Sequence, residues 1–588
     1  MYKTSQDARR WFSWSVAILF EMVGPRGHHG TPWGAPFLFW TVIHAAAYPG
    51  CLAADAPNIV FIIADDLGWN DVGFHGSNQI PTPNIDALAY NGIILNSHYA
   101  QSTSSPSRAA LFTGKYAIKL GMQGSSFLPG EKRSLPEGKL MPEYFKDLGY
   151  STYLVGKWHL GYSRWNETPT FRGFDHHYGF YNGHTSYYDY VGTKTYDGID
   201  YNGFDLRRDG VPSFEDAGHY ATDTFTEYSV KVIEEHDTSK PLFLMIAHLA
   251  VHAGNTGKLL EAPQDEIDKL RHIEDANRRT YAAMVTKLDE SVGTLVEALE
   301  NKKMLQNTVI AFISDNGAPT VAPHFKNWGS NYPLRGLKNT LFEGGIRSVA
   351  FIYSPLLIQS GRVTKDLMHI TDWLPTLYSA ANGDIANLDP EMDGIDQWPS
   401  LVYDLPSPRN DILLNINEKT RNAALRFYNW KLIVGTSMNG TYNEYYGEAV
   451  LDVISEVPYN TSAVFNSKAG RVIRQVSYTP LTETEYEQLR AEATVTRLDP
   501  KAKKNPCDPA SGDVCLYDIP KDPCEENDLA KYFPSVVRRM KRALVEYRKT
   551  LVPQLEEAVD IENSSPKLFG FTWNPWLECS NAACTIPV

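Results

Sequence analysis

Four short apolar runs stand out along the chain, and each is almost continuous in hydrophobic residues. They cover residues 59–64, residues 153–155 with their flanks, residues 242–247 and residues 309–314. Continuous runs of this length are typical of strands that are covered on both faces, and helical patterns lie between them. The pattern predicts an α/β sandwich, in which helices flank a central sheet.

Polar residues follow each of the four runs. They are Asp65-Asp66 after the first run, Lys157-Trp158-His159 after the second, His248 and His252 after the third, and Asp315-Asn316 after the fourth. In open α/β sheets the ligand crevice lies at the carboxyl ends of the strands. Any one of these groups alone is compatible with a solvated loop, but the four together predict a site at one edge of the sheet.

The pattern changes after about residue 405. Residues 424–434 (ALRFYNWKLIV) are typical of an antiparallel strand, whereas residues 436–510 are polar and are interpreted only as surface. Residues 534–552 predict an amphipathic helix with an apolar stripe that serves packing. This stripe consists of Val537, Met540, Leu544, Tyr547 and Leu551.

Three regions follow from this organisation and from the N-terminus. They are a leader over residues 1–53, a catalytic domain over residues 54–405 and a smaller domain over residues 406–588. The length of 588 residues exceeds what one compact core usually holds.

The leader contains a targeting signal. Residues 35–48 are apolar, Arg26 lies before them, and small residues after them predict cleavage behind Ala47 or Ala53. A start at Met22 would give a signal peptide of ordinary length, with an uncleaved anchor as the alternative. The stretch is short for a membrane span, so we expect a protein of the secretory pathway, either extracellular or lysosomal.

Composition limits the partners and the redox compartment. The net charge of −14 argues against a general nucleic-acid binder. Five of the six cysteines lie in the last 82 residues, which indicates local disulfides in a secreted chain. Four glycosylation sequons support the same route. They begin at Asn166, Asn439, Asn460 and Asn563.

The acidic residues at the strand ends have the character of metal ligands. Asp65, Asp66, Asp315 and Asn316 offer only oxygen donors, which suit calcium or magnesium better than zinc. Adjacent carboxylates repel each other when buried without a cation. A pair of helix N-caps is the alternative interpretation of the Asp65-Asp66 doublet.

The segment SSPSRAALFTG, residues 104–114, predicts the start of a helix. Pro106 suits the first turn, with Ser104 or Ser105 as the cap. The positive helix end and Arg108 one turn later would favour an anion there. Further cations at Lys157, Lys338 and His252 indicate sulfate or phosphate ester chemistry.

These motifs resemble the sulfatase family, within which arylsulfatases B, I and J are the most similar. Residues 104–114 resemble its first signature, and GYSTYLVGKWH, residues 149–159, resembles the second. Further blocks that resemble the family are NIVFIIADDLGWNDVGFHG, FISDNG, PLRGLKNTLFEGGIR and HITDWLPTL. The resemblance implies an alkaline-phosphatase-like fold: a large mixed sheet, with a smaller C-terminal domain built on a four-stranded antiparallel sheet.

The resemblance also implies functional roles. One calcium ion would be held by Asp65, Asp66, Asp315, Asn316 and the side chain at position 104. Arg108 and Lys115 would support that side chain, His159 would assist turnover, and the sulfate would be bound by Lys157, His252 and Lys338. The substrate would be a sulfated glycan or a small aryl sulfate.

Position 104 departs from the family pattern. The residue there is oxidised to formylglycine in sulfatases, and eukaryotic members start from cysteine, whereas this chain has serine. A sulfatase-maturing enzyme would be needed as a partner. Without oxidation, Ser104 could accept the sulfuryl group but has no second hydroxyl with which to release it.

Two further hypotheses therefore stand beside a working sulfatase. The first is a pseudoenzyme that binds sulfated glycans without hydrolysing them. The second is a phosphatase or phosphodiesterase of the same superfamily, in which Ser104 itself attacks the ester. Those enzymes often have Asp-His where this chain has Asp315-Asn316, which disfavours the second hypothesis.

Overall fold

The computed structural model describes residues 56–321, 325–447, 458–498 and 504–579. The predicted leader over residues 1–53 lies outside this range, and so do Cys51 and Cys584. Within the described part of the chain, no helix has both the length and the apolar character that crossing a bilayer requires.

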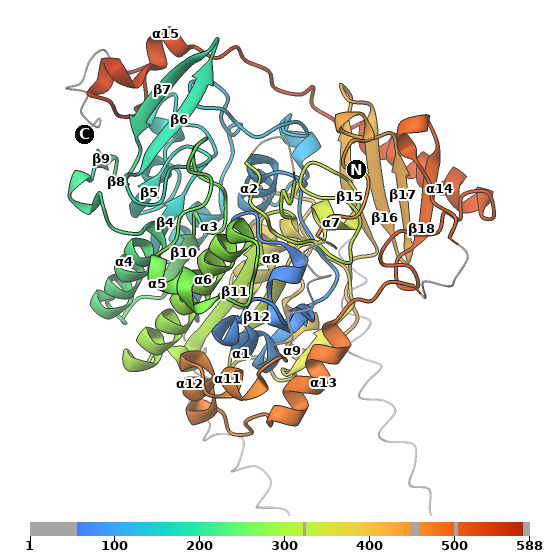
Figure 1. The fold of residues 1–588 in the computed structure, drawn as a ribbon, viewed down its shortest axis with the longest axis horizontal. Helices are drawn as coiled ribbons and strands as arrows, with labels where there is room; N and C mark the ends of the chain where they lie inside the picture. Colours follow the sequence, from blue (N-terminus) through green and yellow to red (C-terminus); the bar gives the residue numbers. More distant parts are fainter. Residues whose placement is uncertain (1–55, 322–324, 448–457, 499–503, 580–588) are drawn as a thin grey trace, which may run out of the picture. The chain divides into compact units, whose positions relative to one another are not determined.

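A ten-stranded mixed sheet forms the centre of the fold (Figure 1). Its strands, in spatial order, are β13 (Arg362–Thr364), β2 (Ile93–Leu95), β12 (Ala350–Tyr353), β11 (Thr308–Ser314), β1 (Asn58–Ala64), β10 (Leu242–Ala247), β4 (Ser151–Lys157), β5 (His176–Phe180), β8 (Arg207–Arg208) and β9 (Val211–Pro212). The four apolar runs are therefore confirmed as strands, and they are neighbours in the order β11, β1, β10, β4.

These four strands and β5 all run in the same direction. β1 pairs in parallel with both β11 and β10, so that Ile63 lies between Ile313 and Ala247. β10 pairs in parallel with β4, and β4 in parallel with β5. Parallel strands end at one edge of a sheet, which brings the polar residues that follow them to the same edge.

Alternate residues of the central strands pack against different helices, since successive side chains point to opposite faces. On β1, Val60 and Ile62 belong to one apolar core, and Phe61 and Ile63 to the other. The first core includes residues of α1 (Pro83–Asn91), α4 (Ala221–Glu235), α6 (Ala276–Asn301) and α12 (Lys468–Val476). The second includes residues of α2 (Ser104–Thr113), α3 (Met141–Asp147), α8 (Trp373–Ala380) and α9 (Trp398–Tyr403).

The smaller sheet is antiparallel and four-stranded, as the resemblance implied. Its strands are β15 (Asp411–Asn417), β16 (Asn422–Phe427), β17 (Trp430–Val434) and β18 (Val514–Asp518). The prediction of one strand over residues 424–434 was wrong, because this segment is a hairpin. Tyr428 adopts φ 49° at its turn, between β16 and β17. The limits of the two predicted domains remain a prediction.

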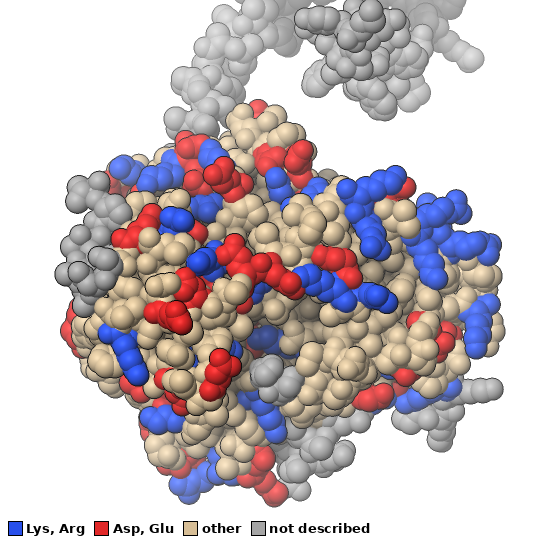
Figure 2. All heavy atoms as spheres, turned by 90° about the horizontal axis from the view of Figure 1, so that it is seen from above, with Lys and Arg blue, Asp and Glu red and all other residues tan. Residues whose placement is uncertain are grey.

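Helix α14 (Pro534–Arg548) packs on this sheet through the predicted stripe. Met540 and Leu544 are buried, and Val537, Tyr547 and Leu551 are partly buried against the same core. Its outward residues are largely basic and exposed, and blue side chains gather on the side where α14 lies in Figure 2. The surface is therefore unevenly charged despite the net charge of −14.

Residues 436–510 are more than surface. α11 (Thr461–Phe465), α12 and α13 (Glu483–Ala493) bury Ile473, Tyr486 and Ala493 in the core that also contains α1 and α6. Tyr486 Oη accepts a hydrogen bond from Asn91 Nδ2 at 2.7 Å, which ties α13 to α1. The apolar residues of these short helices are sparse, which is why the polar composition hid them.

Buried charges join the smaller sheet to the larger part of the chain. Lys431 on β17 lies with its Nζ 2.9 Å from Glu343 Oε1 and 2.8 Å from Glu525 Oε1, and all three side chains are fully buried. Glu343 begins the short helix α7 (Glu343–Ile346), five residues after Lys338. This network therefore fixes the segment that carries Lys338 to the smaller sheet.

The cysteines and sequons agree in part with the prediction. Cys507 and Cys515 form a local disulfide, and Cys579 is also disulfide-bonded. Cys524 is a free, buried thiol, and burial raises its pKa. The four sequon asparagines are all exposed, so each is accessible to glycosylation, which remains a prediction.

A buried histidine makes stability depend on pH. His98, in β3 (His98–Tyr99), accepts a hydrogen bond from Trp373 Nε1 at 2.9 Å on Nε2, so Nδ1 carries the proton and faces Ser348 Oγ at 2.8 Å. Burial lowers the pKa of His98 to about 3. Its contribution to stability is therefore complete above its unfolded pKa of about 6.5 and falls by about 1.4 kcal/mol per pH unit as the pH drops toward 3.

We expect His98→Gln to remove this dependence. In urea unfolding at pH 7, 6 and 5, the free energy of unfolding should fall less steeply with pH in the variant than in the wild type. Below pH 6 the two slopes should differ by about 1.4 kcal/mol per pH unit, which corresponds to one bound proton. Equal slopes in the two proteins would show that His98 is not a source of the acid sensitivity.

Candidate active site

The strand ends bring most of the predicted residues together. Asp65 and Asp66 follow β1, Lys157 ends β4, and Asp315 follows β11, while His252 lies in the loop after β10. All five are at least 95% buried. His248 is not part of the cluster, because its Nε2 faces Ser291 Oγ of α6 at 3.1 Å.

Helix α2 places Ser104 at the cluster. The helix begins at Ser104 itself, with Thr103 as its N-cap, so the prediction that Ser104 or Ser105 is the cap was one or two residues late. Ser104 Oγ lies 3.3 Å from Asp65 Oδ1 and 3.3 Å from Asn316 Oδ1. At the first helical position, Ser104 also faces the positive end of the helix.

Its neighbour Ser105 holds the surrounding loops in place. Ser105 Oγ donates to the carbonyl of His159 at 3.0 Å and accepts from the backbone N–H of Phe127 at 3.1 Å. Ser105 therefore ties the start of α2 to the loop after β4 and to the 125–128 loop. The sequence indicated Ser105 only as a possible helix cap, because nothing in its local pattern predicts these long-range contacts.

The three carboxylates are each paired with a cation. Lys157 Nζ lies 2.5 Å from Asp65 Oδ2, and Lys338 Nζ lies 2.6 and 2.8 Å from the two oxygens of Asp66. Arg108 Nη2 lies 3.1 Å from Asp315 Oδ2. The three positive and three negative charges of these side chains therefore cancel.

The pKa values of the two lysines shift in opposite directions. Burial lowers the pKa of Lys157, although the Asp65 carboxylate acts in the other direction. For Lys338 burial also acts to lower the pKa, but the carboxylates of Asp66, Asp65 and Asp315 outweigh it and raise the pKa. Lys338 therefore stays charged, facing Asp66.

The two site histidines have defined proton positions. His159 Nε2 lies 3.0 Å from the carbonyl of Phe127, so it must donate there, and Nδ1 is buried without a hydrogen-bond partner. His252 Nδ1 lies 2.6 Å from the carbonyl of Ala253, which leaves Nε2 free, 3.5 Å from Asp66 Oδ2. Burial lowers the pKa of His159 well below 6.5 and that of His252 to about 3, so both are neutral imidazoles with one free acceptor nitrogen.

A pocket of about 640 Å³ opens onto the cluster. Ser104, His159, His252 and Lys338 lie at its base. Its walls include Phe127, Leu128, Lys194, Leu259, Phe325 and Lys326. Gly183 also lines it, and a side chain there would collide with His159, since an added Cβ would lie 2.8 Å from the imidazole ring.

Sequence reasoning missed His184, which also lines this pocket. Its ring stacks on that of His252 at 5.7 Å, and its Nε2 is buried without a hydrogen-bond partner. His184 follows β5, whose sequence HHYGF is not an apolar run. The search for polar residues behind apolar runs therefore did not recognise β5 as a strand and did not reach His184.

Lys115 is not part of the site. Its Nζ pairs with Asp389 Oδ2 at 2.7 Å, and its side chain is 21% exposed. The ten-residue helix α2 separates it from Ser104, a distance of about 15 Å at 1.5 Å per residue. The prediction that Lys115 supports the side chain at position 104 is therefore wrong: proximity in the signature is not proximity in space.

We expect Lys115→Ala to leave the affinity for inorganic sulfate within about twofold of the wild type, because a partly exposed ion pair contributes little. Lys157→Ala is the contrasting variant, since it leaves the buried Asp65 without its cation. Affinity for inorganic sulfate, measured by calorimetry, should fall only in the second variant. A large loss in both would return Lys115 to the site.

The arrangement provides oxygen donors beside a concentrated positive charge. Asp65, Asp66, Asp315 and Asn316 offer oxygens of the kind that hard divalent cations prefer. Donor atoms of Asp65, Asp66 and His252 lie within 4.8 Å of one another. Because the surrounding side-chain charges cancel, a bound divalent cation would leave the site positive, and the single negative charge of a sulfate ester would offset half of that charge.

Comparisons with known proteins agree with this chemistry. A protein-family model described as Sulfatase matches residues 57–383. Mouse arylsulfatase J is 36% identical over 537 residues, which cover 90% of this chain and 82% of that protein. Mouse N-acetylgalactosamine-6-sulfatase is 33% identical over 376 residues, which cover 60% of this chain and 68% of that protein.

Solved structures share the fold. The crystal structure of Ps i-CgsB in complex with k-i-k-neocarrahexaose matches with a TM-score of 0.65 at 26% identity, covering 87% of this chain and 97% of that one. The PsFucS1 sulfatase from Pseudoalteromonas sp. matches with a TM-score of 0.59 at 25% identity, covering 85% of this chain and 92% of that one.

Proposed function

This chain belongs to the sulfatase family of sulfuric ester hydrolases, and on that premise we propose that it is a calcium-dependent sulfatase acting on sulfated sugars or aryl sulfates. The observation that carries the proposal is the convergence of three buried carboxylates and three buried cations around Ser104, which lines a pocket together with Lys338. Names among the relatives and neighbours, N-acetylgalactosamine-6-sulfatase and a complex with neocarrahexaose, support a sugar substrate.

The residues present fit a calcium ion. Asp65, Asp66, Asp315, Asn316 and the side chain at position 104 would hold it, since all are buried and offer hard oxygen donors. When bound, calcium supplies positive charge that polarises the ester and the residue at position 104. Asp65 Oδ1 and Asn316 Oδ1, each 3.3 Å from Ser104 Oγ, support this assignment.

The two lysines would bind the sulfate group, and His252 would join them only when its Nε2 is protonated, because its Nδ1 already faces the carbonyl of Ala253. Lys338 and His252 line the pocket, and Lys157 lies just behind them against Asp65. Ammonium groups that already face carboxylates can turn one N–H toward a sulfate oxygen without moving far. Arg108 holds Asp315 and also lies 3.8 Å from Asp65, so its role is to position the donors.

Ser104 and His159 would carry the covalent chemistry. In the proposed enzyme Ser104 would be converted to formylglycine, and one hydroxyl of its hydrated aldehyde would bond to sulfur while the S–O bond to the alcohol breaks and the proton passes to that alcohol. The second hydroxyl would then lose its proton and expel sulfate, which restores the aldehyde. The free Nδ1 of His159 can then accept a proton during release of sulfate, because its Nε2 is committed to Phe127. The conversion requires a sulfatase-maturing enzyme as a partner. We place this step in the secretory pathway, on the way to the cell exterior or the lysosome.

Serine at position 104 favours a second candidate function. If Ser104 is not oxidised, the chain would bind sulfated glycans and stall after one transfer, because serine has no second hydroxyl with which to expel sulfate. The intact cation cluster would then serve binding alone.

Two measurements decide between these functions. Mass spectrometry of the segment 100–117, from protein secreted by eukaryotic cells, reveals oxidation as the loss of two hydrogens from serine. An aryl sulfate assay with excess calcium measures turnover for the wild type and for Ser104→Cys. Oxidation with turnover supports the enzyme; an unmodified serine without turnover overturns it, and activity in Ser104→Cys alone supports the glycan-binding function.

A further inference from the structure

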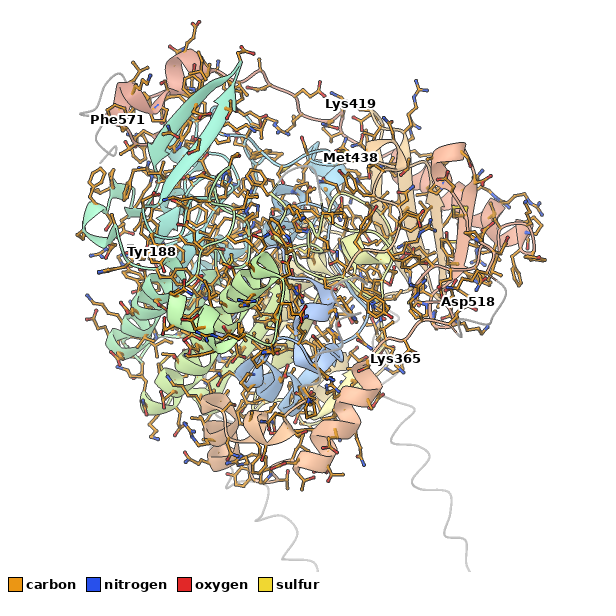
Figure 3. The ribbon with its side chains drawn as sticks, in the orientation of Figure 1. Tyr188, Lys365, Lys419, Met438, Asp518 and Phe571 are labelled. Carbon is orange, nitrogen blue, oxygen red and sulfur yellow. A yellow bond between two sulfur atoms is a disulfide. The ribbon has the colours of Figure 1, made fainter. Side chains whose placement is uncertain are left out.

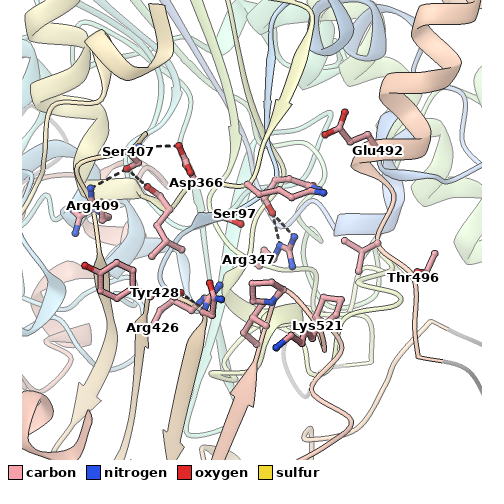
Figure 4. Close-up of a pocket in the computed structure, with 18 of the residues that line it drawn as sticks. Ser97, Arg347, Asp366, Ser407, Arg409, Arg426, Tyr428, Glu492, Thr496 and Lys521 are labelled. Carbon is pink, nitrogen blue, oxygen red and sulfur yellow. Dashed lines mark hydrogen bonds between the residues drawn. The ribbon is translucent and has the colours of Figure 1, made fainter. Parts of the chain in front are cut away.

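A second pocket, of about 560 Å³, lies apart from the candidate active site (Figure 4). No residue lines both pockets. One wall comes from the larger part of the chain, with Ser97, Arg347 and Lys365, and the other from the smaller sheet, with Arg426 and Lys521. Figure 3 places Lys365 and Asp518, which precedes Lys521, on the same side of the molecule.

Three arginines that line this pocket are buried, and they differ in their partners. Arg409 is neutralised, because its Nε lies 2.7 Å from Asp372 Oδ2. Arg347 Nε donates to the carbonyl of Asn96 at 2.8 Å, and its Nη1 lies 3.5 Å from Glu343 Oε2. These two guanidinium groups therefore have a carboxylate within reach.

Arg426 has none. Its Nε donates to Tyr99 Oη at 3.3 Å and its Nη1 to the carbonyl of Tyr428 at 2.6 Å, and both acceptors are neutral. Among the ion pairs of the described residues, none includes Arg426, although its exposed fraction is only 3%. A buried guanidinium without a carboxylate is costly unless an anion reaches it.

The surrounding buried network does not supply that anion. Glu343 and Glu525 are its two carboxylates, and Lys431 lies between them. Counting Arg347 and Arg426, three buried cations face two carboxylates. Tyr99 Oη donates to Glu343 Oε2 at 2.9 Å, so Arg426 is joined to this network by hydrogen bonds through a neutral hydroxyl. Burial acts to raise the pKa of Glu343, but the charges of Lys431, then Arg347 and then Arg426 outweigh it and lower that pKa. One positive charge is left in excess, on the side of the pocket.

We propose that this pocket binds a tetrahedral oxyanion, sulfate or phosphate, free or carried by a sugar, between the guanidinium groups of Arg426 and Arg347. Such anions match the fork of N–H donors that arginine presents. Lys365 and Lys521 add positive charge at the mouth. In Figure 4, Arg347, Arg426 and Lys521 lie together in the lower half of the view, while Asp366 and Glu492, the two carboxylates of the lining, lie above them.

Calorimetry on the full-length protein tests the proposal. Sodium sulfate, sodium phosphate and galactose 6-sulfate are titrated into the wild type, Arg426→Gln and Lys338→Gln. We expect Arg426→Gln to weaken one binding event at least about tenfold, the loss expected when a hydrogen bond to a charged group is removed. Lys338→Gln should leave that event unchanged, because Lys338 lines only the other pocket. The most tightly bound titrant identifies the source of the oxyanion.

The outcomes separate this proposal from the proposed function. If the active site does not bind sulfate, the Arg426-dependent event should still be present. Isotherms for Arg426→Gln that equal those of the wild type would overturn the second site. Should Arg426→Gln fail to fold, wild-type crystals grown without sulfate or phosphate and soaked in sodium tungstate give the answer: an anomalous peak beside Arg426 supports the site, and its absence refutes it.

Discussion

Replacing Ser104 by alanine is expected to lower the turnover of an aryl sulfate by at least about a thousandfold, because the substitution removes the group proposed to accept the sulfuryl group. Ser104 Oγ is the hydroxyl that lies between the oxygens of Asp65 and Asn316, at the base of the pocket. The lysines and histidines that would hold the sulfate keep their contacts, so binding of inorganic sulfate should change by no more than about threefold.

The measurement uses two parallel backgrounds. The Ser104→Ala variant is compared with the wild type and with Ser104→Cys, all made in eukaryotic cells. The rate of aryl sulfate hydrolysis is measured with calcium in excess. A Ser104→Ala protein that retains the rate of the active form would show that another residue attacks the ester. Loss of both turnover and sulfate binding would indicate instead that Ser104 is needed to keep the site folded.

Asp66→Asn should have the second large effect, on metal binding. The Asp66 carboxylate contacts Lys338 at 2.6 and 2.8 Å and accepts from Asn316 Nδ2 at 2.6 Å. The amide that this substitution introduces would place an NH2 group beside the donors Lys338 Nζ and Asn316 Nδ2, and the substitution removes one negative charge. We expect calcium affinity to fall by at least about a hundredfold, together with turnover.

The loss should also appear in stability. Without metal, the variant leaves Lys338 buried beside a neutral side chain, which costs on the order of 3–5 kcal/mol when a buried pair is broken. Asp389→Asn is the matched control, because its carboxylate pairs with Lys115 near the surface, and it should stay within about 1 kcal/mol of the wild type. Calcium titration and urea unfolding measure both effects; equal behaviour of the two variants would contradict the assignment.

The sequence was sufficient for the parts of the fold that depend on a strong local pattern. Uninterrupted apolar runs identified β1, β4, β10 and β11, and the rule that ligands lie at the carboxyl ends of strands gathered Asp65, Lys157 and Asp315 correctly. Both inferences need only the period of hydrophobic residues and the direction of parallel strands.

The errors arose where long-range contacts decide. Lys115 directly follows the signature that contains Ser104, but helix α2 runs between them and places the two residues at its opposite ends. His184 follows a strand too polar to be recognised. The helices between residues 461 and 493 pack against α1 and α6, so their structure depends on partners that lie 160 residues or more away in the sequence.

The buried cluster of Glu343, Lys431 and Glu525 bears on how such a protein can be recombined. A chimera that joins the first four hundred residues of this chain to the C-terminal part of a relative would have to supply a lysine and a glutamate at equivalent places. Otherwise Glu343, five residues from Lys338, would lose its contact with Lys431 and would depend on Arg347, whose Nη1 lies 3.5 Å from its carboxylate. Exchange of modules between relatives is therefore constrained by charge pairing across the junction as well as by the shape of the two surfaces.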